Sequence, residues 1–456
     1  MDSNSSPSNT IPVVSTLASP LESPPPPALN ADADSSSSSA RKPITLWPGM
    51  YHSPVTDALW EARASIFEEL YDPEKDGLPQ TEFLTRTPSQ SRTTILYRFS
   101  SDYSLRELRR IYRDLWNDVR IGKLVEELDA LAGFITVKHC SDDDSTTRPL
   151  LLVTASVDRI VLKKPISVEV DLKMVGSVIW VGRSSMDIQL EVTQSNEAES
   201  SDVSDSVALT ANFIFVARDS KTGKASQVNR LCPETELEKF LFEKSEARNK
   251  LRRTKRGGDR RELENAEVNR LKTLLAEGRI FSDMPALADR DSILLRDTRL
   301  ENALICHPQQ RNMHGRIFGG FLMHRAFELA FSTAYAFAGL VPCFLEVDHV
   351  DFLRPVVIGD FLRMKSCVLY TEVENPEQPL IYVEVVAHVT RPEMRSSEVS
   401  NTFYFTFTVR PEAKAIKNGF RIRNVVPATK EEARRVLARM DAEVLKRVDD
   451  QESMPQ

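Results

Sequence analysis

Cysteine is scarce in this chain, and its few copies are poorly placed for cross-linking or metal binding. The five cysteines are an odd number and are scattered over 456 residues (Cys140, Cys232, Cys306, Cys343 and Cys367). No two of them have the spacing of a zinc ligand pair, and no His-Glu-x-x-His sequence is present. We therefore expect no disulfide framework, no bound metal and a reducing compartment.

Several other signatures are also missing. The chain has no Gly-x-Ser-x-Gly elbow, no P-loop and no dinucleotide fingerprint. The formal net charge of −7 argues against general binding to nucleic acid. The most apolar segment, residues 321–337, carries His324, Arg325 and Glu328 and is too short and too polar to predict a membrane span. A hydrophobic content of 41% and a charged content of 27% are typical of a globular protein in water.

Residues 1–43 lack both basic charge and an apolar block. No Lys or Arg precedes Arg41, whereas Asp2, Glu22, Asp32 and Asp34 are acidic. A secretory signal needs an apolar block, and a mitochondrial presequence is rich in Arg and poor in acids. Serine, proline and alanine dominate the segment, so it cannot bury enough apolar surface to fold. This composition favours a disordered tail on a cytoplasmic protein, with a serine-rich plastid leader as the alternative.

The remainder alternates between strand-like and helix-like segments, and it does so twice. In the first set we expect strands at 93–99, 134–139, 150–161, 168–180, 186–192 and 209–216, with a helix at 121–132. In the second set we expect strands at 299–306, 344–352, 361–373, 381–391 and 402–410, with a helix at 321–337.

Three further helical stretches frame these sets. A lead-in helix begins after Ser53, and a charged helix covers residues 430–448. Between the sets, residues 232–279 form a highly charged helical stretch that Gly257 and Gly258 interrupt. Its basic residues could form a phosphate or nucleic-acid patch or a solvated helical connector, and we favour the connector.

A loop with three glycines leads into the apolar helix of the second set. The segment Asn312-Met-His-Gly-Arg-Ile-Phe-Gly-Gly contains Gly315, Gly319 and Gly320, which permit tight turns and close approach of a ligand to bare backbone. The first N–H groups of a helix have no partner within it, and the helix dipole favours negative charge there. Such a loop can hold a phosphate or polarise a carbonyl that is becoming an oxyanion, although it can also be a plain turn.

Two patterns of the first set recur in the second. Residues 157–166 match residues 347–356 position for position, and the Phe-x-Phe-x-x-Arg sequence at 213–218 recurs at 405–410. The proline within each copy of the first pattern falls at the rim of a strand, where a missing N–H is tolerated. Two unrelated patterns repeated in register indicate a duplicated domain, so we expect a tandem that mimics a homodimer.

The motif Asn-x-x-Gly-x-x-Phe-Gly-Gly before a buried helix resembles the hotdog-fold acyl-coenzyme A thioesterases. Residues 117–133 and 351–360 extend the likeness to the double-hotdog acyl-coenzyme A thioesterase 9 subgroup, which includes plant organellar members. The resemblance covers about residues 90–412. It implies an α+β fold of two tandem hotdog domains, each a curved antiparallel sheet wrapped round a central helix, with active sites between two units.

The resemblance also implies the function. The chain is expected to hydrolyse fatty acyl-CoA to free fatty acid and coenzyme A, with no cofactor beyond the coenzyme A of the substrate. It is expected to form a homo-oligomer of double-hotdog protomers, and the chloroplast or the mitochondrion becomes the alternative location. A hydroxyacyl-thioester dehydratase and a non-catalytic acyl-CoA sensor or scaffold are the alternative functions.

The family places an acid on the central helix, seven residues after the second glycine of a pair. Counting from Gly122 gives Asp129, whereas counting from Gly320 gives Phe327. Glu328 is one step late and is turned about 100° round the helix. The resemblance therefore assigns the acid to the first repeat, where it would activate water or attack the thioester directly.

The complementary donors are expected from the second repeat. Asn312 and the N–H of Gly315 belong to the glycine loop, and Asp114 stands where the first repeat would need the Asn. We therefore expect one composite catalytic site of Asp129 and Asn312 at the interface of the repeats, and an empty or degraded opposite interface. The remaining candidate substrate-binding residues are His314, Gly319, Gly320 and Arg354. His324 and Glu328 are expected to form a structural pair.

These inferences divide the chain into six parts. We expect a tail at 1–43, a lead-in with a helix at 44–88, a first hotdog domain at 89–220, a charged connector at 221–284, a second hotdog domain at 285–412 and a C-terminal helix and tail at 413–456.

Overall fold

The computed structural model describes residues 55, 83–100, 110–141, 150–194, 207–219, 222–257, 265–310, 316–375, 377–416 and 421–452. The tail expected at 1–43 and most of the lead-in expected at 44–88 lie outside these residues.

The first repeat contains a long helix and five main strands. Its elements are β1 (Thr85–Arg86), α2 (Pro88–Ser91), β2 (Thr93–Tyr97), α4 (Ile121–Cys140), β3 (Leu150–Leu162), β4 (Leu172–Val181), β5 (Ser185–Thr193), β6 (Val207–Asp219) and β7 (Arg230–Leu231). Two helices follow it, α5 (Glu236–Gly257) and α6 (Asn265–Asp283). Residues 258–264 lie outside the described residues, so the interruption expected at Gly257 and Gly258 stays a prediction.

The second repeat has the same plan. Its elements are η3 (Pro285–Leu287), β8 (Ser292–Leu294), η4 (Leu295–Thr298), β9 (Leu300–Ile305), η5 (Pro308–Gln310), α7 (Gly319–Ala338), β10 (Pro342–Phe352), β11 (Phe361–Glu372), β12 (Leu380–Arg391), η6 (Pro392–Met394), β13 (Ser396–Val409), α8 (Pro411–Ile416), β14 (Asn424–Val426) and α9 (Lys430–Glu452). The expected strands of both sets are present, except for one.

The strand expected at 134–139 is wrong, because α4 continues without a break to Cys140. Three residues with β propensity, Ile135, Thr136 and Val137, suggested a strand, and Gly133 suggested a break. All four are nevertheless helical, and every one of them is buried. Burial of a whole helix by its domain outweighs the weak local preference of these side chains.

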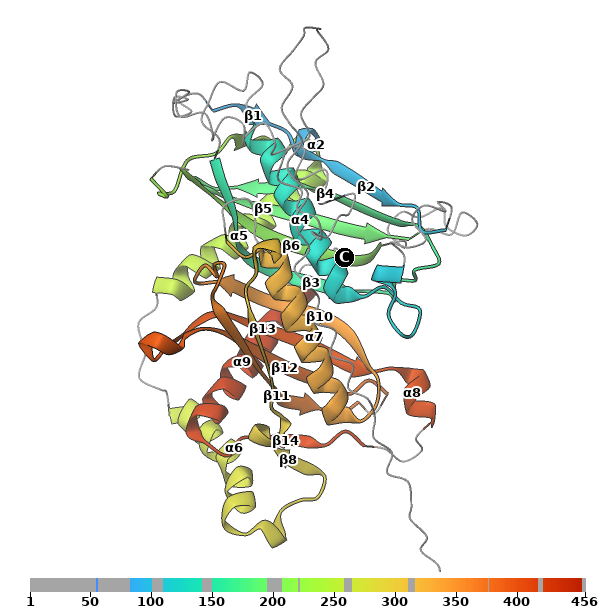
Figure 1. Cartoon of the computed structure of the whole chain (residues 1–456), viewed down its shortest axis with the longest axis vertical. Helices are drawn as coiled ribbons and strands as arrows, with labels where there is room; N and C mark the ends of the chain where they lie inside the picture. Colours follow the sequence, from blue (N-terminus) through green and yellow to red (C-terminus); the bar gives the residue numbers. More distant parts are fainter. Residues whose placement is uncertain are drawn as a thin grey trace, which may run out of the picture. The chain divides into compact units, whose positions relative to one another are not determined.

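The two repeats share one ten-stranded antiparallel sheet, in the order β2-β4-β5-β6-β3-β10-β13-β12-β11-β9 (Figure 1). They meet where β3 pairs with β10, with Val157 opposite Val350 and Ile160 opposite Val347. Val157 and Val347 are equivalent in the repeat, as are Ile160 and Val350. Val157 thus faces the equivalent of Ile160, and Ile160 faces the equivalent of Val157. This reciprocal pairing is the pattern of a twofold interface. The duplication inferred from the sequence is built into the strand register.

The long helices α4 and α7 lie side by side on one face of this sheet (Figure 1). Leu124, Leu128 and Leu131 of α4 have no exposed surface, and Ala326 and Ala330 of α7 have none either. The helices are therefore central to their repeats, and their contact brings the start of each one beside the other repeat.

Two charged helices cover the other face. Arg248 of α5 lies 3.1 Å from the carboxylate of Asp187 and 4.0 Å from that of Asp158. Arg439 of α9 binds Asp348, which is the equivalent of Asp158 in the repeat. The connector inferred from the sequence is thus partly a packing element, because α5 turns Arg248 towards the sheet.

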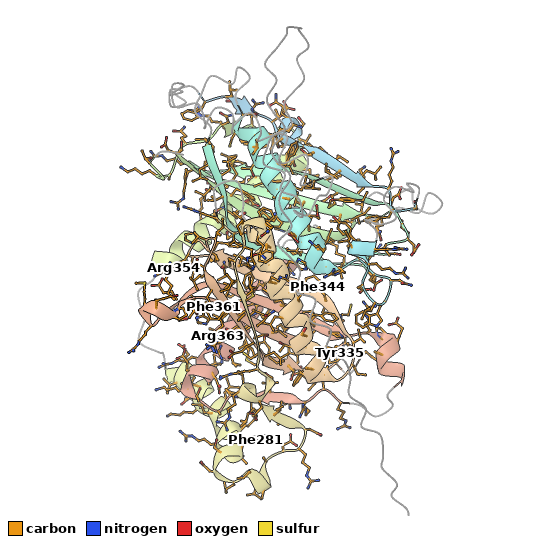
Figure 2. The ribbon with its side chains drawn as sticks, viewed as in Figure 1. Phe281, Tyr335, Phe344, Arg354, Phe361 and Arg363 are labelled. Carbon is orange, nitrogen blue, oxygen red and sulfur yellow. The ribbon has the colours of Figure 1, made fainter. Side chains whose placement is uncertain are left out.

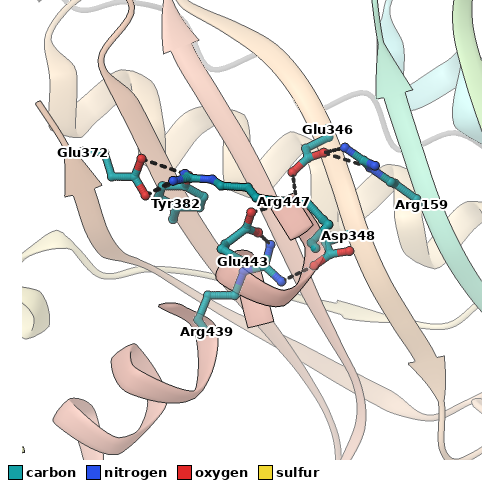
Figure 3. A network of polar contacts seen from close by, with 9 residues as sticks. Arg159, Glu346, Asp348, Glu372, Tyr382, Arg439, Glu443 and Arg447 are labelled. Atoms are coloured by element: carbon teal, nitrogen blue, oxygen red, sulfur yellow. Dashed lines mark hydrogen bonds and ion pairs between the residues drawn. The ribbon is translucent and has the colours of Figure 1, made fainter. Parts of the chain in front are cut away.

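The ion pairs of α9 extend into the first repeat (Figure 3). Lys446 of α9 binds Glu346 of β10, and Glu346 also accepts a hydrogen bond of 3.1 Å from Arg159 of β3. Arg447 pairs with Glu372 at 2.8 Å. The pair of Lys446 with Glu346 is largely buried, so the cost of removing both charges from water offsets much of their attraction.

Candidate active site

Asp129 of α4 reaches from the first repeat to the second. Its side chain has no exposed surface. Its Oδ2 accepts a hydrogen bond of 2.7 Å from the backbone N–H of Gly320, the second residue of α7. Its Oδ1 accepts one of 2.9 Å from the Thr154 hydroxyl on β3. The carboxylate is therefore held at the interface of the repeats, against the start of the helix that follows the glycine loop.

Glycine is required at this contact because the two helices approach closely. A Cβ atom on Gly320 would lie 3.0 Å from both the Cα and the carbonyl oxygen of Glu126 in α4. A Cβ atom on Gly319 would lie 3.2 Å from Oδ2 of Asp129. A side chain at Gly320 would thus require α7 and α4 to move apart by a few tenths of an ångström, which would lengthen the hydrogen bond to Asp129.

The arrangement suits a carboxylate that carries out chemistry. Removing an ionised carboxylate from water is costly unless donors replace the water. The N–H of Gly320 supplies a charge-assisted hydrogen bond, and the positive end of the α7 dipole adds to it. Thr154 holds the other oxygen, so the carboxylate is fixed in orientation. A carboxylate fixed in this way can in principle accept a proton or attack a carbonyl carbon.

The other residues singled out in the sequence have different outcomes. Asn312, His314 and Gly315 lie outside the described residues. The N–H of Gly320, expected to face a substrate, donates to Asp129 instead. Arg354 is exposed at the edge of the second repeat and pairs with Glu398 (Figure 2).

Thr154 was missed in the sequence, although a signal for it exists. In the β3–β6 pairing Thr154 lies opposite Phe215, and in the β10–β13 pairing Phe344 lies opposite Phe407. Thr154 and Phe344 are therefore equivalent in the two repeats. A hydroxyl in a place where the other copy has a phenyl ring marks a position that one repeat uses for polar contact.

The opposite interface is lined by rings where the first has polar groups. Phe327, seven residues after Gly320, and Phe344 occupy the places of Asp129 and Thr154, and their ring centroids are 5.4 Å apart in an edge-to-face contact. A pocket of about 1790 Å³ opens beside them between the loop that precedes α4 and the length of α7. We call it the second-interface pocket. The opposite interface thus lacks the polar side chains of the first interface, but it contains a large pocket.

An ionic bridge joins α4 and α7 beside this pocket. His324 lies 3.0 Å from Glu126 through Nδ1 and 3.0 Å from Glu328 through Nε2. Arg120 lies 2.8 Å from Glu328. The hydrogen bond from His324, working against burial, lowers the pKa of Glu328 to about 2. Glu328 is therefore a structural anion and a poor base, as the expected pairing with His324 implied.

Two further kinds of feature, a metal site and a membrane-spanning helix, were sought in the described part of the chain. No three His, Cys, Asp or Glu side chains gather there as a metal site would require. Among the helices in that part, none has the length and apolar character needed to cross a membrane.

Fold and site define a class of protein: a double hotdog with a buried carboxylate held between its repeats. No family model matches the chain. It is 76% identical over 444 residues to acyl-coenzyme A thioesterase 2, chloroplastic, of Humulus lupulus, covering 97% of this chain and 99% of that relative. It is 64% identical over 438 residues to acyl-coenzyme A thioesterase 4, mitochondrial, of Humulus lupulus, covering 96% of this chain and 81% of that relative.

A more distant relative connects the chain to the subgroup named by the sequence motifs. Acyl-coenzyme A thioesterase 9, mitochondrial, of Homo sapiens is 34% identical over 351 residues, covering 75% of each chain. The chain belongs to the acyl-coenzyme A thioesterase family. The resemblance inferred from the motifs and the α+β double-hotdog fold are confirmed. The expected cytoplasmic location finds no support in these relatives, whose names place them in organelles.

Proposed function

We propose that the chain hydrolyses fatty acyl-CoA to free fatty acid and coenzyme A, and that it does so at the interface that holds Asp129. The relatives named as acyl-coenzyme A thioesterases support the reaction. The observation that carries the choice of site is the buried Asp129 carboxylate, bound to Gly320 of the other repeat at 2.7 Å. We propose that the hotdog domains comprise residues 89–220 and 285–412, joined by the connector at 221–284.

In the water route, Asp129 accepts a proton from water as the water oxygen bonds to the thioester carbonyl carbon. The carbonyl oxygen becomes an oxyanion, which then collapses and breaks the C–S bond. The departing thiolate of coenzyme A takes up the proton, and the acyl group leaves as the fatty acid. In the covalent route, Asp129 attacks the carbonyl carbon itself, expels the thiolate and forms an anhydride that water then cleaves.

The donors divide into two groups by their position. Thr154 and the N–H of Gly320 hold the carboxylate, so their role is to position Asp129. The side chain of Asn312 and the N–H of Gly315, in the loop just before α7, would donate to the oxyanion or hold the water. His314 and Gly319 would line the site, and Arg354 would meet a phosphate of coenzyme A at the edge of the protein.

Replacing Asp129 by Asn tests the assignment. The amide keeps the shape but is a poor proton acceptor, so kcat is expected to fall about 100- to 10,000-fold. Release of free thiol from a panel of acyl-CoA substrates measures it. Glu384→Gln is the matched control, because Glu384 is a buried carboxylate that pairs with Arg435 on the outer face of the sheet. Undiminished hydrolysis in Asp129→Asn, with the fold intact, would overturn the proposal.

Isotope labelling separates the two routes. A single turnover in water enriched in oxygen-18 places the label only in the fatty acid when water attacks directly. The anhydride route allows label to enter the Asp129 carboxylate when water attacks its carbonyl carbon, and mass spectrometry of the peptide that contains Asp129 detects it.

We propose an organellar location for this chain, because its relatives at 76% and 64% identity are named chloroplastic and mitochondrial. A fluorescent fusion of the full chain is expected to enter an organelle, and a fusion that lacks residues 1–43 is expected to remain outside. We also propose assembly of the double-hotdog chain into a homo-oligomer. Light scattering of the purified protein measures the number of chains.

A further inference from the structure

The second-interface pocket is large enough for a ligand and lies apart from Asp129. Its volume of about 1790 Å³ exceeds the usual size of small-molecule pockets. It runs along α7, and Phe344 and Tyr335 both belong to its lining (Figure 2). Leu115 stands at its rim with 90% of its surface exposed. A pocket of this size is a candidate binding site.

Aromatic rings form the pocket wall. The rings of Phe327 and Phe331 are 6.2 Å apart, those of Phe331 and Tyr335 are 6.4 Å apart, and Trp116 lies 6.0 Å from Phe331 across the interface. Such a row of rings along one helix offers an extended apolar surface. An alkyl chain laid along α7 would be buried against it.

The charges of the lining argue against a polyanionic occupant. Three arginines and four carboxylates line the pocket (Arg113, Arg120 and Arg410; Asp114, Asp118, Glu328 and Glu412). Most are already paired: Arg410 lies 2.8 Å from Asp118 and 3.5 Å from Asp114, and Arg120 lies 2.8 Å from Glu328. The several phosphate charges of coenzyme A would meet a surface with no excess of positive charge.

One cation of the pocket lining, Arg113, forms no ion pair with a carboxylate of the described residues. Arg113 donates through Nε, at 2.7 Å, to the neutral side-chain oxygen of Asn117, and within the described residues no carboxylate lies within ion-pair distance of it. It therefore retains a full positive charge at the loop that forms one wall. A single carboxylate is the anion that this wall can neutralise.

We propose that the second-interface pocket binds a long-chain fatty acid without any chemistry, with the alkyl chain along Phe327, Phe331 and Tyr335 and the carboxylate at Arg113. Phe327 and Phe344 replace the carboxylate and the hydroxyl of the other interface, so a ligand here meets no counterpart of Asp129 or Thr154. Only the description of this fatty acid as the enzyme's product rests on the proposed function. Binding would make the pocket a sensor of accumulated product.

Quenching of Trp116 by a brominated fatty acid tests the proposal. Bromine quenches indole emission at contact, so dibromostearic acid is expected to quench the full-length protein to a saturable extent. Trp116→Phe keeps an aromatic ring beside Phe331 and is expected to remove that saturable component. Saturable quenching that persists in Trp116→Phe would overturn the proposal. The measurement needs no turnover, so its failure is distinct from any failure of Asp129 to catalyse hydrolysis.

Two pairs of variants locate the ligand within the pocket. Arg113→Glu is expected to raise the Kd for dibromostearic acid about three- to fivefold, whereas the exposed Arg290→Glu leaves it unchanged. Ala336→Phe narrows the pocket from an exposed position of α7 and is expected to weaken binding. Ala438→Phe makes the same change at an exposed position of α9, away from the pocket, and is expected to have no effect.

Competition identifies the head group. Unlabelled stearic acid is expected to displace the probe, and its methyl ester is expected to do so more weakly. Coenzyme A alone and a non-hydrolysable stearoyl-CoA thioether are expected to displace it poorly. Displacement by either coenzyme A compound at a lower concentration than by stearic acid would overturn the assignment of a fatty acid, as would equal binding to Arg113→Glu and Arg290→Glu.

Discussion

The two interfaces between the repeats have the same backbone plan, but one buries polar side chains and the other buries aromatic rings. At the first, Asp129 accepts hydrogen bonds from Thr154 and Gly320. At the second, Phe327 and Phe344 stand in their places and contact each other edge to face. A homodimer would have two equal sites, whereas a fused chain can change one without the other. The difference separates the polar side chains of the first interface, which the proposed reaction would use, from the rings that the fold accepts in the same places.

Each interior is stable only with its own set of side chains. The buried carboxylate depends on donors from both repeats, and it would be costly without them. The rings depend on one another: Phe327 lies 5.9 Å from Phe405 and 6.0 Å from Phe407. Placing the side chains of one interface into the other should therefore lower the free energy of unfolding in either direction. The size of that loss measures how far the two interfaces have diverged.

The largest effect is expected for Phe327→Asp, which places a carboxylate at the second interface. The new charge would lie among aromatic rings, so the free energy of unfolding is expected to fall by about 3–5 kcal/mol. Urea denaturation measures the change. Phe327→Leu is the control for lost volume alone. An equal loss in both variants would mean that charge is tolerated there and that the comparison overstates the difference.

The next effect is expected for Asn312→Ala, which removes the side chain proposed to hold the oxyanion or the water. The kcat for acyl-CoA hydrolysis is expected to fall about 100- to 1000-fold, the range for loss of one oxyanion donor. Asn375→Ala removes an Asn whose side chain accepts a hydrogen bond from the Glu377 N–H in an exposed turn, and it is expected to have no effect on kcat. Equal rates in the two variants would assign the donor elsewhere.

A smaller effect is expected for Thr154→Val, which keeps the shape but removes the hydroxyl that binds Asp129. One lost hydrogen bond to a charged group corresponds to a fall in kcat of about tenfold. Thr154→Ser retains the hydroxyl and should restore most of the rate. The ratio of the two variants, measured by thiol release, isolates the hydroxyl from the packing of the β-branched side chain. A slow Thr154→Ser would point to packing alone.

The sequence was informative wherever the signal was periodic or repeated. The duplication could be read from residues 157–166 and 347–356 because strand rims and core positions must recur when a domain does. Asp129 could be placed at the interface because the family spacing is carried by a rigid helix. The spacing did not predict the hydrogen bond between Asp129 and Gly320, and the pairing of Asp129 with Asn312 remains a prediction.

Other features depend on three-dimensional packing, which the spacing of residues along the sequence does not reveal. Thr154 is 25 residues from Asp129 in the chain, and only the position of β3 beside α4 brings them together. The end of α4 was missed because its last turns are rich in Ile, Thr and Val, and burial overrides their local preference. The second-interface pocket is a space between side chains, so only three-dimensional packing reveals it.

The smallest effect is expected in the pH dependence of the unfolding free energy, to which His324 at the second interface contributes. Burial alone would lower the pKa of His324, but the hydrogen bonds to Glu126 and Glu328 outweigh it and raise the pKa above its ordinary value of 6.5. A raised pKa in the folded protein means that protonated His324 stabilises fully below pH 6.5 and that this stabilisation is lost as the pH rises through the folded pKa. His324→Gln is therefore expected to lose about 1 kcal/mol of unfolding free energy near pH 6 and less near pH 9.

Urea denaturation of wild type and His324→Gln at a series of pH values isolates this contribution, because other titrating groups cancel in the difference. The nearby charges of Lys123, Arg120 and Arg325 are common to both proteins. A difference that stays constant between pH 6 and pH 9 would show that the bridge is not ionic.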